Sequence, residues 1–449
     1  MRWPRCFVAL RVVLSLDMSA SPSFLRWAWI PALFFFLPVL TGPPGYAQNK
    51  PPAPRNMLYA AIGDELIHYD VDAAKGALNR RGSVTLPGNV QEAWPHPSKK
   101  FLYVAWSNGG ASYATAGGAA SAGDRHGVSV YSIDPVSGAL TPRGKPAALP
   151  SRPIYITTDV EGAHVITAHN DPSGLTVHRI LADGTVGEEV KQSEKLDFGV
   201  YGHQVRVDPS NQTVILVTRG NGPTATKAEE PGALRIFSYD HGVLSNRQTV
   251  APNGGFNYQI RHLEFHPSGK WDYATLERQN KLHVYRRSAQ GTLSDAPLFV
   301  KDTLSDPGKA PNGQAASSIH VHPNGQFIYV ANRASATVEF EGQRVFAGGE
   351  NTIAVFSINP ETGEPTLIQS ADTHGFQPRT FALDGSGSVL AVANQSSMLV
   401  RDGSHATLAP AGVVLFRIHA DGKLEFTNRY DIETGGSRSL FWEGIVSLP

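Results

Sequence analysis

The sequence predicts an all-β protein, and within that class a seven-bladed β-propeller of four-stranded antiparallel blades. Two observations lead to this prediction. The 449-residue chain contains 44 glycines and 32 prolines, and such a composition is typical of a fold with many turns. A phrase made of an apolar strand, a short turn and a second apolar strand also recurs at intervals of roughly 50 to 60 residues, which is the length of one propeller blade.

The repeated phrase predicts six blades directly. Its turns, such as His322-Pro-Asn-Gly325 and Asp208-Pro-Ser-Asn211, favour a tight reversal between two strands. A third apolar strand follows most copies, as in residues 353–358. The clear copies of the phrase are 203–218, 261–277, 318–333 and 379–394, and the weaker copies are 91–106 and 153–169.

The two ends of the chain predict the seventh blade. Residues 57–62, 66–71 and 81–86 resemble the outer strands of a blade, but no inner strand precedes them. Residues 438–442, near the C-terminus, resemble the opening of the repeats. We therefore expect the C-terminal strand to complete the first blade, which would close the ring and remove an exposed sheet edge. The propeller domain is expected to span residues 56–449.

The N-terminal region predicts export. Residues 27–40 form an apolar run that follows Arg26 and precedes Gly45-Tyr-Ala47, a small-x-small cleavage pattern. We interpret residues 1–47 as a signal peptide, with Met18 as a candidate true start, and residues 48–55 as a Pro-rich linker. The predicted location is periplasmic or extracellular. The alternative is an uncleaved anchor, although the run is shorter than the roughly 20 residues that a membrane span needs.

Charge and cysteine content exclude several classes of protein. The 39 basic residues balance the 39 acidic ones, so no global field favours nucleic acid or an anionic membrane surface. Cys6 is the single cysteine, which excludes a disulfide framework and a thiolate zinc site. We therefore expect no cofactor, no metal, no nucleic-acid partner, no membrane contact after signal cleavage, and a monomer.

Three segments carry a resemblance to a known family. The phrases at 260–270, 319–333 and 378–384 resemble those of the seven-bladed propeller lactonases, which include bacterial 6-phosphogluconolactonases and the fungal carboxy-cis,cis-muconate cyclase. The resemblance covers roughly residues 55–449 and implies a polar site at one mouth of the central channel. The cyclase uses a His, two Arg and a Glu. By motif position this set implies that His203, Arg261, Glu277 and Arg333 are catalytic.

This chain departs from the family pattern near His203. Tyr201-Gly-His203 stands where relatives carry Pro-His, and Thr218-Arg219-Gly220 stands where an Asp is common. A long insert follows at 221–232, and another at 107–127 is rich in Gly, Ala and Ser, consistent with either a flap over the channel or a solvated loop. These departures weaken the case for a phosphogluconate substrate and leave the fold prediction unchanged.

Further candidate residues share equivalent positions at strand ends, which a propeller gathers around one axis. Arginine forks bind carboxylate or phosphate at two points, so a set of them would hold a small anionic lactone or sugar acid. The alternative for each arginine is a structural bond to a carbonyl or a neighbouring blade. The predicted substrate-binding residues are Arg152, His262, His320, Arg379, Gln395 and Arg438.

These observations together predict a lactone hydrolase that acts at the channel mouth. Glu277 or His203 would activate water, while Arg261 and Arg333 would stabilise the negative charge on the carbonyl oxygen. A structural salt bridge is the simpler alternative for Glu277. Two other functions stay open: an exported non-catalytic propeller that binds an anionic ligand or a partner protein, and a lactonising isomerase similar to the muconate cyclase. Export favours the first of these, because phosphogluconolactone is a cytoplasmic metabolite.

Overall fold

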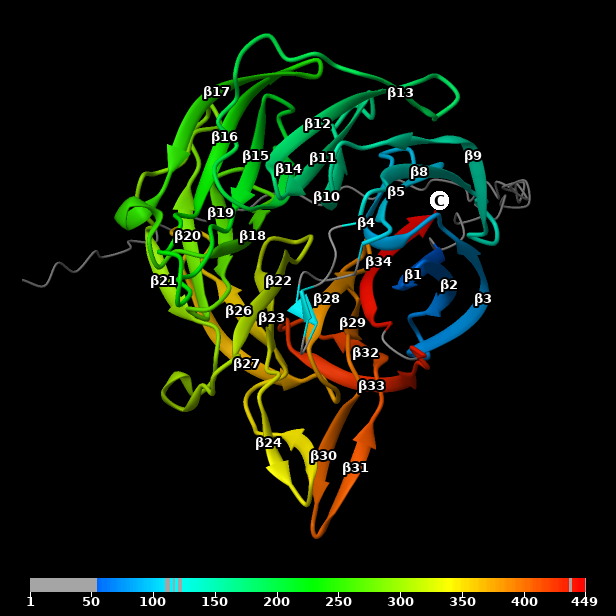
Figure 1. Ribbon diagram of the computed structural model, residues 1–449, viewed down its shortest axis with the longest axis vertical. Coiled ribbons are helices and arrows are strands. Elements are labelled where there is room, and N and C mark those ends of the chain that lie inside the picture. The colour runs from blue at the N-terminus through cyan, green and yellow to red at the C-terminus, as the bar shows by residue number, and fades with distance from the viewer. Residues whose placement is uncertain (1–54, 110–113, 116–117, 120–122, 436–437, 449) are drawn as a thin grey trace, which may run out of the picture. The chain divides into compact units, whose positions relative to one another are not determined.

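Seven four-stranded antiparallel sheets follow one another around a ring in the computed structural model (Figure 1). The structure describes residues 55–109, 114–115, 118–119, 123–435 and 438–448. The predicted signal peptide (1–47) and almost all of the predicted linker (48–55) lie outside these residues, and Arg55 already belongs to the first strand. Within the described part of the chain, no helix has the length and apolar character needed to cross a membrane.

Each blade has an inner, a second, a third and an outer strand. The inner strands are β34 (Leu440–Leu448), β4 (Asn89–Pro95), β10 (Pro153–Thr158), β14 (Gly202–Val207), β18 (Ile260–Phe265), β22 (Ala315–Val321) and β28 (Pro378–Leu383). The second strands are β1 (Arg55–Ile62), β5 (Phe101–Ser107), β11 (His164–Asn170), β15 (Thr213–Thr218), β19 (Trp271–Leu276), β23 (Phe327–Arg333) and β29 (Val389–Asn394).

The third and outer strands lie farther from the axis. The third strands are β2 (Glu65–Asp72), β8 (His126–Ile133), β12 (Ser173–Ile180), β16 (Ala233–Asp240), β20 (Lys281–Arg286), β26 (Thr352–Ile358) and β32 (Gly412–Ile418). The outer strands are β3 (Ala77–Thr85), β9 (Leu140–Ala148), β13 (Val186–Glu189), β17 (Val243–Val250), β21 (Phe299–Asp302), β27 (Pro365–Asp372) and β33 (Leu424–Asp431). Two short 3₁₀ turns, Pro252–Gly255 and Pro307–Lys309, lie in connections.

The C-terminal strand closes the ring as the sequence predicts. Strand β34 pairs with β1 in antiparallel register, with Met57 opposite Val446, and so becomes the inner strand of the first blade. It begins at Leu440 and runs to Leu448, so it starts later and is longer than the predicted segment 438–442. Each inner strand also contacts the inner strands of the two neighbouring blades, from β34 through β4 and around to β28.

Every inner strand carries one extra residue opposite its second strand. The register shifts near the start of each inner strand, so that one residue is bulged out of the ladder. A β-bulge re-aims the side chain that it carries, and bulges are frequent near active sites. The bulged residues are Gln91, Ile154, His203, Arg261, Arg379 and Phe441, and in β22 the extra residue lies at 317–318.

Repeated side-chain bonds join consecutive blades. The imidazole of His322, in the turn after β22, bonds the carbonyl of Gly387 in the next blade at 2.9 Å. His96 and His266 make the same bond to Gly162 and Gly325 at 3.0 and 2.8 Å. All three histidines precede a proline in the turn that follows an inner strand. Buried tyrosines on second strands also donate to glycine carbonyls of the next blade: Tyr59 to Gly138, Tyr103 to Gly184, Tyr273 to Gly363 and Tyr329 to Gly422.

Three inserts interrupt the connection between second and third strands with a hairpin. The insert at 107–127 contains the short pair β6 (Ala114–Thr115) and β7 (Gly118–Ala119). The sequence did not predict the pairs β24 (Thr337–Phe340) with β25 (Gln343–Phe346) and β30 (Met398–Asp402) with β31 (His405–Ala409). These two hairpins contact each other and extend together from neighbouring blades (Figure 1). The insert at 221–232 is an irregular loop pinned by a bridge between Asn221 and Glu230.

Candidate functional site

One glutamate pairs with three arginines where equivalent strands of neighbouring blades end. Glu277 follows strand β19, and its carboxylate accepts hydrogen bonds from Arg219 at 3.1 Å and from Arg333. The Nε atom of Arg261 lies 3.8 Å from the same carboxylate. Three different blades supply these arginines, because equivalent strand ends meet around one axis. The structure thus brings Arg261, Glu277 and Arg333 together, as the sequence predicts.

Charge is unbalanced in this cluster. The arginines hold the pKa of Glu277 well below its ordinary value despite its burial, so its carboxylate is ionised and hydrogen-bonded. Arg261 is 1% exposed, and its Nε and Nη1 atoms make no hydrogen bond within the protein. Burial and neighbouring arginines lower the pKa of Arg261 well below its ordinary range and that of Arg379 to about 9. One carboxylate therefore faces several cations, which favours an anionic ligand.

His203 lies among these arginines with a neutral imidazole. It is the bulged residue of β14 and is 6% exposed. Burial is the main cause that lowers its pKa well below 6.5, and Arg261, Arg219, Arg379 and Arg333 lower it further. Its Nδ1 atom has no hydrogen-bond partner in the protein. A neutral imidazole with an unbonded nitrogen can accept a proton at neutral pH.

A cavity of about 610 Å³ opens beside the cluster, and we call it the mouth cavity. Arg219, Glu277 and Arg333 line one side of it. The rest of the lining comes from the connection before β22 and from the ends of neighbouring strands. These lining residues are Arg278, Asn280, 310–315, Ala334, Ser335 and Gln377. The volume falls within the roughly 300–1,000 Å³ typical of small-molecule pockets.

Four other predicted residues lie around this mouth with different surroundings. Arg379 is the bulged residue of β28, and its guanidinium packs 3.9 Å from the ring centroid of Phe441. Arg152 is 2% exposed and donates to Gln91 at 2.7 Å. Gln395 is half-buried at the end of β29. Arg438 is exposed and donates to the carbonyl of Thr434 in its own loop, so the structure does not bring it into the arginine cluster.

The structure places His262 and His320 in the lining of a second cavity, although the ring of His262 also packs edge-to-face on His203 with ring centroids 5.2 Å apart. This cavity has a volume of about 340 Å³, and we call it the channel cavity. The residue that follows the bulge lines it in every blade: Glu92, Tyr155, Gln204, His262, Thr380 and Trp442, with Ser318 and Ile319 in β22. The lining continues to Pro323, Asp384 and Gly385, which lie in turns after the inner strands. The channel cavity therefore reaches the face opposite the mouth cavity.

Two residues outside the predicted set belong to these sites. Arg219 follows Thr218 at the end of β15, which is the position that Glu277 holds after β19, so its place in the repeat identifies it as a strand-end cation. Glu92 lies beside the arginines, accepts a hydrogen bond from the indole of Trp442, and has a pKa raised by burial to about 8. Its role depends on the bulge in β4, which no sequence pattern indicates.

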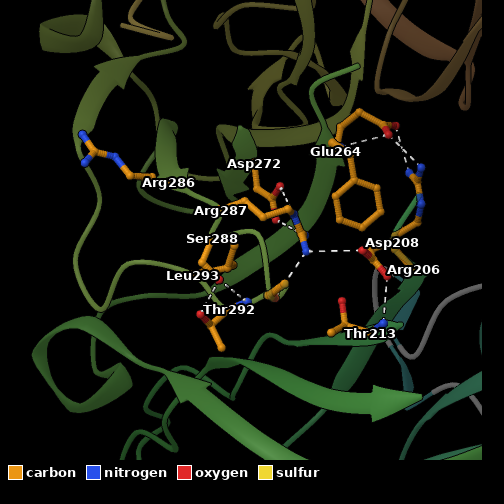
Figure 2. Close-up of polar contacts among 12 residues, drawn as sticks. Arg206, Asp208, Thr213, Glu264, Asp272, Arg286, Arg287, Ser288, Thr292 and Leu293 are labelled. Carbon is orange, nitrogen blue, oxygen red and sulfur yellow. Dashed lines mark hydrogen bonds and ion pairs between the residues drawn. The ribbon is translucent and has the colours of Figure 1, made fainter. Parts of the chain in front are cut away.

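A second charged cluster lies between blades at the other end of the inner strands (Figure 2). Arg206 of β14 binds Glu264 of β18 with two hydrogen bonds of 2.9 and 2.7 Å. Arg287 binds Asp272 in the same two-point manner and lies 4.0 Å from Asp208. Each of the two guanidinium groups here has a carboxylate partner, so this network joins blades and leaves no excess positive charge for an anionic ligand. Among the described residues, no group of three or more His, Cys, Asp or Glu is arranged to hold a metal ion.

The closed ring of seven four-stranded blades, with arginines gathered where equivalent strands end, defines a seven-bladed β-propeller. The family description "Lactonase, 7-bladed beta-propeller" matches residues 58–402, and the chain belongs to this family. The resemblance noted in the sequence is thereby confirmed.

Two kinds of relative support this assignment. The 6-phosphogluconolactonase of Pectobacterium carotovorum is 29% identical over 361 residues, which cover 76% of this chain and 89% of that protein. The 6-phosphogluconolactonase of Bacillus subtilis is 26% identical over 348 residues, covering 76% and 87%. The solved structure of the periplasmic gluconolactonase of Pseudomonas aeruginosa shares the fold, with a TM-score of 0.61 and 19% identity over 88% of this chain and 99% of that one.

Proposed function

We propose that this protein is a lactone hydrolase that opens an anionic sugar-type lactone in the mouth cavity. The observation that carries the proposal is the excess of positive charge: Arg219, Arg261 and Arg333 share the single carboxylate of Glu277. A carboxylate or phosphate on the substrate would balance this charge. The names of the relatives, 6-phosphogluconolactonase and gluconolactonase, support a sugar lactone as the substrate class.

His203 is the proposed proton acceptor. A water molecule attacks the lactone carbonyl carbon, and His203 takes one proton from it as the new C–O bond forms. The ring C–O bond then breaks, and the imidazolium returns the proton to the departing ring oxygen. One water is consumed and one hydroxy acid forms. The neutral state of His203 and its unbonded Nδ1 atom support this role.

The arginines are proposed to stabilise the developing oxyanion. Arg261 is suited to this step because burial strengthens its interaction with a new negative charge, and two of its nitrogens have no hydrogen bond in the protein. Glu277 is the proposed positioning residue for the arginines. Its carboxylate already accepts hydrogen bonds from Arg219 and Arg333, and the arginines hold its pKa well below its ordinary value, so the salt-bridge role is favoured over proton transfer.

A lactone panel with matched variants tests the proposal. Proton release would be followed with glucono-δ-lactone and its 6-phosphate, using the mature chain, Arg261→Gln, His203→Gln and the control Arg417→Gln. Arg417 is exposed and pairs with Glu425 on the surface. We expect the first two variants to lose about 10²–10³-fold in kcat, as for removal of an oxyanion donor or a general base. The control should match the wild type.

Two results would contradict the proposal. Equal activity in the folded Arg261→Gln and His203→Gln variants would remove the mechanism. Absence of turnover by the wild type, together with calorimetric binding of 6-phosphogluconate that is lost in Arg333→Ala, would assign the site to a non-catalytic binding protein.

A further inference from the structure

The channel cavity has a chemistry different from that of the mouth cavity. Its lining is mainly apolar and includes four aromatic side chains, Trp94, Tyr155, Phe381 and Trp442. The mouth cavity, by contrast, is lined by arginines and by residues 310–315, which lead into β22. The channel cavity has a volume of about 340 Å³, at the lower end of the roughly 300–1,000 Å³ range of ligand pockets, and this volume suits a single small ring.

Strand β4 presents an acid and an aromatic ring to this cavity. Glu92 and Trp94 are two residues apart on the strand, so their side chains leave the same face. Both side chains are half-buried, which leaves part of each open to the cavity. The indole of Trp442 donates to one oxygen of Glu92 and fixes the carboxyl group. An aromatic face beside an oriented carboxyl group matches the C–H face and the hydroxyls of a sugar ring.

The opposite wall supplies two imidazoles as further polar groups. His262 is 7% exposed, and burial lowers its pKa well below 6.5, so it is a neutral donor and acceptor. His320 is half-buried, lies 3.4 Å from Glu264 and packs edge-to-face on Phe381 with ring centroids 4.8 Å apart. Arg379 and Arg261 act on the carboxyl group of Glu92, the phenol of Tyr155 lies near it, and the carboxyl groups of Asp384 and Glu443 line the same cavity.

Charge decides which ligand this cavity would take. Burial raises the pKa of Glu92 to about 8, so the carboxyl group is mainly protonated at pH 7 and both donates and accepts hydrogen bonds. Asp384 and Glu443 also line the cavity, but Asp384 is engaged by Asn56 and by the backbone of its own turn, and burial raises the pKa of Glu443. A cationic ligand would therefore find little fixed negative charge there, and the nearby Arg261 and Arg379 would repel it. An anion would find its counter-charges in the mouth cavity and not among these aromatic rings. An uncharged ligand avoids both costs.

We propose that the channel cavity is a second binding site, for an uncharged hydroxylated ring compound such as a free monosaccharide. Trp94 stacks on the ring, and Glu92 bonds its hydroxyls. The site is separate from the mouth cavity and opens on the opposite face, so it does not depend on lactone hydrolysis.

Tryptophan fluorescence provides the test, since Trp94 and Trp442 are two of the four tryptophans among the described residues. The wild type would be titrated with glucose, with the anion gluconate and with the cation glucosamine. We expect a saturable change with glucose that persists in the mouth variant Arg333→Ala. The affinity should fall about tenfold or more in Glu92→Leu, which removes the hydroxyl partner, and likewise in Trp94→Leu.

Several outcomes would overturn the proposal. They are no saturable response of the wild type to glucose, loss of that response in folded Arg333→Ala, or tighter binding of glucosamine or gluconate than of glucose in a manner that depends on Glu92. The wild type and Arg333→Ala decide the question even if the Glu92 and Trp94 variants do not fold. Because glucose is not a lactone, failure of this test leaves the proposed hydrolase activity standing, and loss of turnover leaves this proposal standing.

Discussion

At the scale of single residues, burial sets the chemistry of the site. Desolvation disfavours the charged form of every ionisable group, and neighbouring charges either oppose or reinforce this shift of the pKa. Arginines overcome burial at Glu277 and keep it ionised, whereas at His203 burial and the same arginines act in the same direction and keep it neutral. Glu277 and His203, the two candidates for the base in the sequence, are therefore separated by their surroundings.

This difference predicts the acid limb of the pH profile. A histidine with an unperturbed pKa would lose its capacity to accept a proton as the pH falls through about 6.5. Because the pKa of His203 lies well below that value, we expect kcat/KM to stay constant through pH 6.5 and to fall only at lower pH. The measurement is kcat/KM for a turned-over lactone between pH 4.5 and 8, corrected for spontaneous hydrolysis. An acid limb centred at or above pH 6.5 would refute the assignment of His203.

Glu443 predicts an effect on stability that also depends on pH. It is 3% exposed, neither carboxyl oxygen makes a hydrogen bond of normal geometry, and burial raises its pKa well above 4.5. The folded state binds its proton more tightly than the unfolded state does. The contribution of Glu443 to stability is therefore full below pH 4.5 and is lost as the pH rises toward the folded pKa, by about 1.4 kcal/mol per pH unit.

Glu443→Gln should remove this penalty. We expect the urea midpoint of the variant to match the wild type near pH 4.5 and to exceed it at pH 7.5. The exposed Glu425→Gln serves as the control and should show no such difference between the two pH values. A midpoint for Glu443→Gln below that of the wild type at pH 7.5 would mean that the carboxylate is ionised and paired.

At the scale of strands, the sequence predicted the blades well but not the bulges. Apolar alternation and turn residues such as His322-Pro identify hairpins, because both are local signals. His203 and Arg261 are the bulged residues of β14 and β18, and each bulge depends on the pairing register of the inner strand with the second strand. For the same reason, Glu92 and the position of His320 in the channel cavity were not predicted. The hairpins β24–β25 and β30–β31 were missed because each is a short insert outside the repeated phrase.

The tyrosine bonds between blades give a prediction at this scale. Tyr329 is fully buried, and its hydroxyl donates to the carbonyl of Gly422 in the next blade at 3.0 Å. Tyr329→Phe leaves that carbonyl without its donor, so the free energy of unfolding should fall by about 1–3 kcal/mol. Tyr131→Phe, at a tyrosine with no such inter-blade bond, is the matched control. Equal urea midpoints for the two variants would show that the bond adds no net stability.

At the scale of the whole molecule, ring closure and charge distribution both follow from the repeat. The chain has no net charge, yet the mouth gathers Arg219, Arg261, Arg333 and Arg379. The acids pair with cations elsewhere, as Glu264 does with Arg206. Repetition explains this separation, since equal positions in different blades converge on one mouth. The sequence could predict the convergence but not the partners, because distances across the axis depend on the closed ring.

Removal of the C-terminal strand tests the closure. Strand β34 pairs with β1 along residues 55–62 and contacts the inner strands on both sides, so a chain that ends at Arg438 would lose the inner strand of the first blade. The edge of β1 would then be exposed, and exposed edges pair with other chains. The apolar residues Trp442 and Val446 of β34, which belong to a buried cluster, would also be lost.

We expect the truncated chain to aggregate or to unfold at a much lower temperature than the full chain. Addition of a synthetic peptide of residues 438–449 should restore part of the loss. Light scattering and thermal melting monitored by circular dichroism measure both effects, and a truncated chain that stays monomeric with an unchanged melting temperature would show that the ring does not depend on this strand.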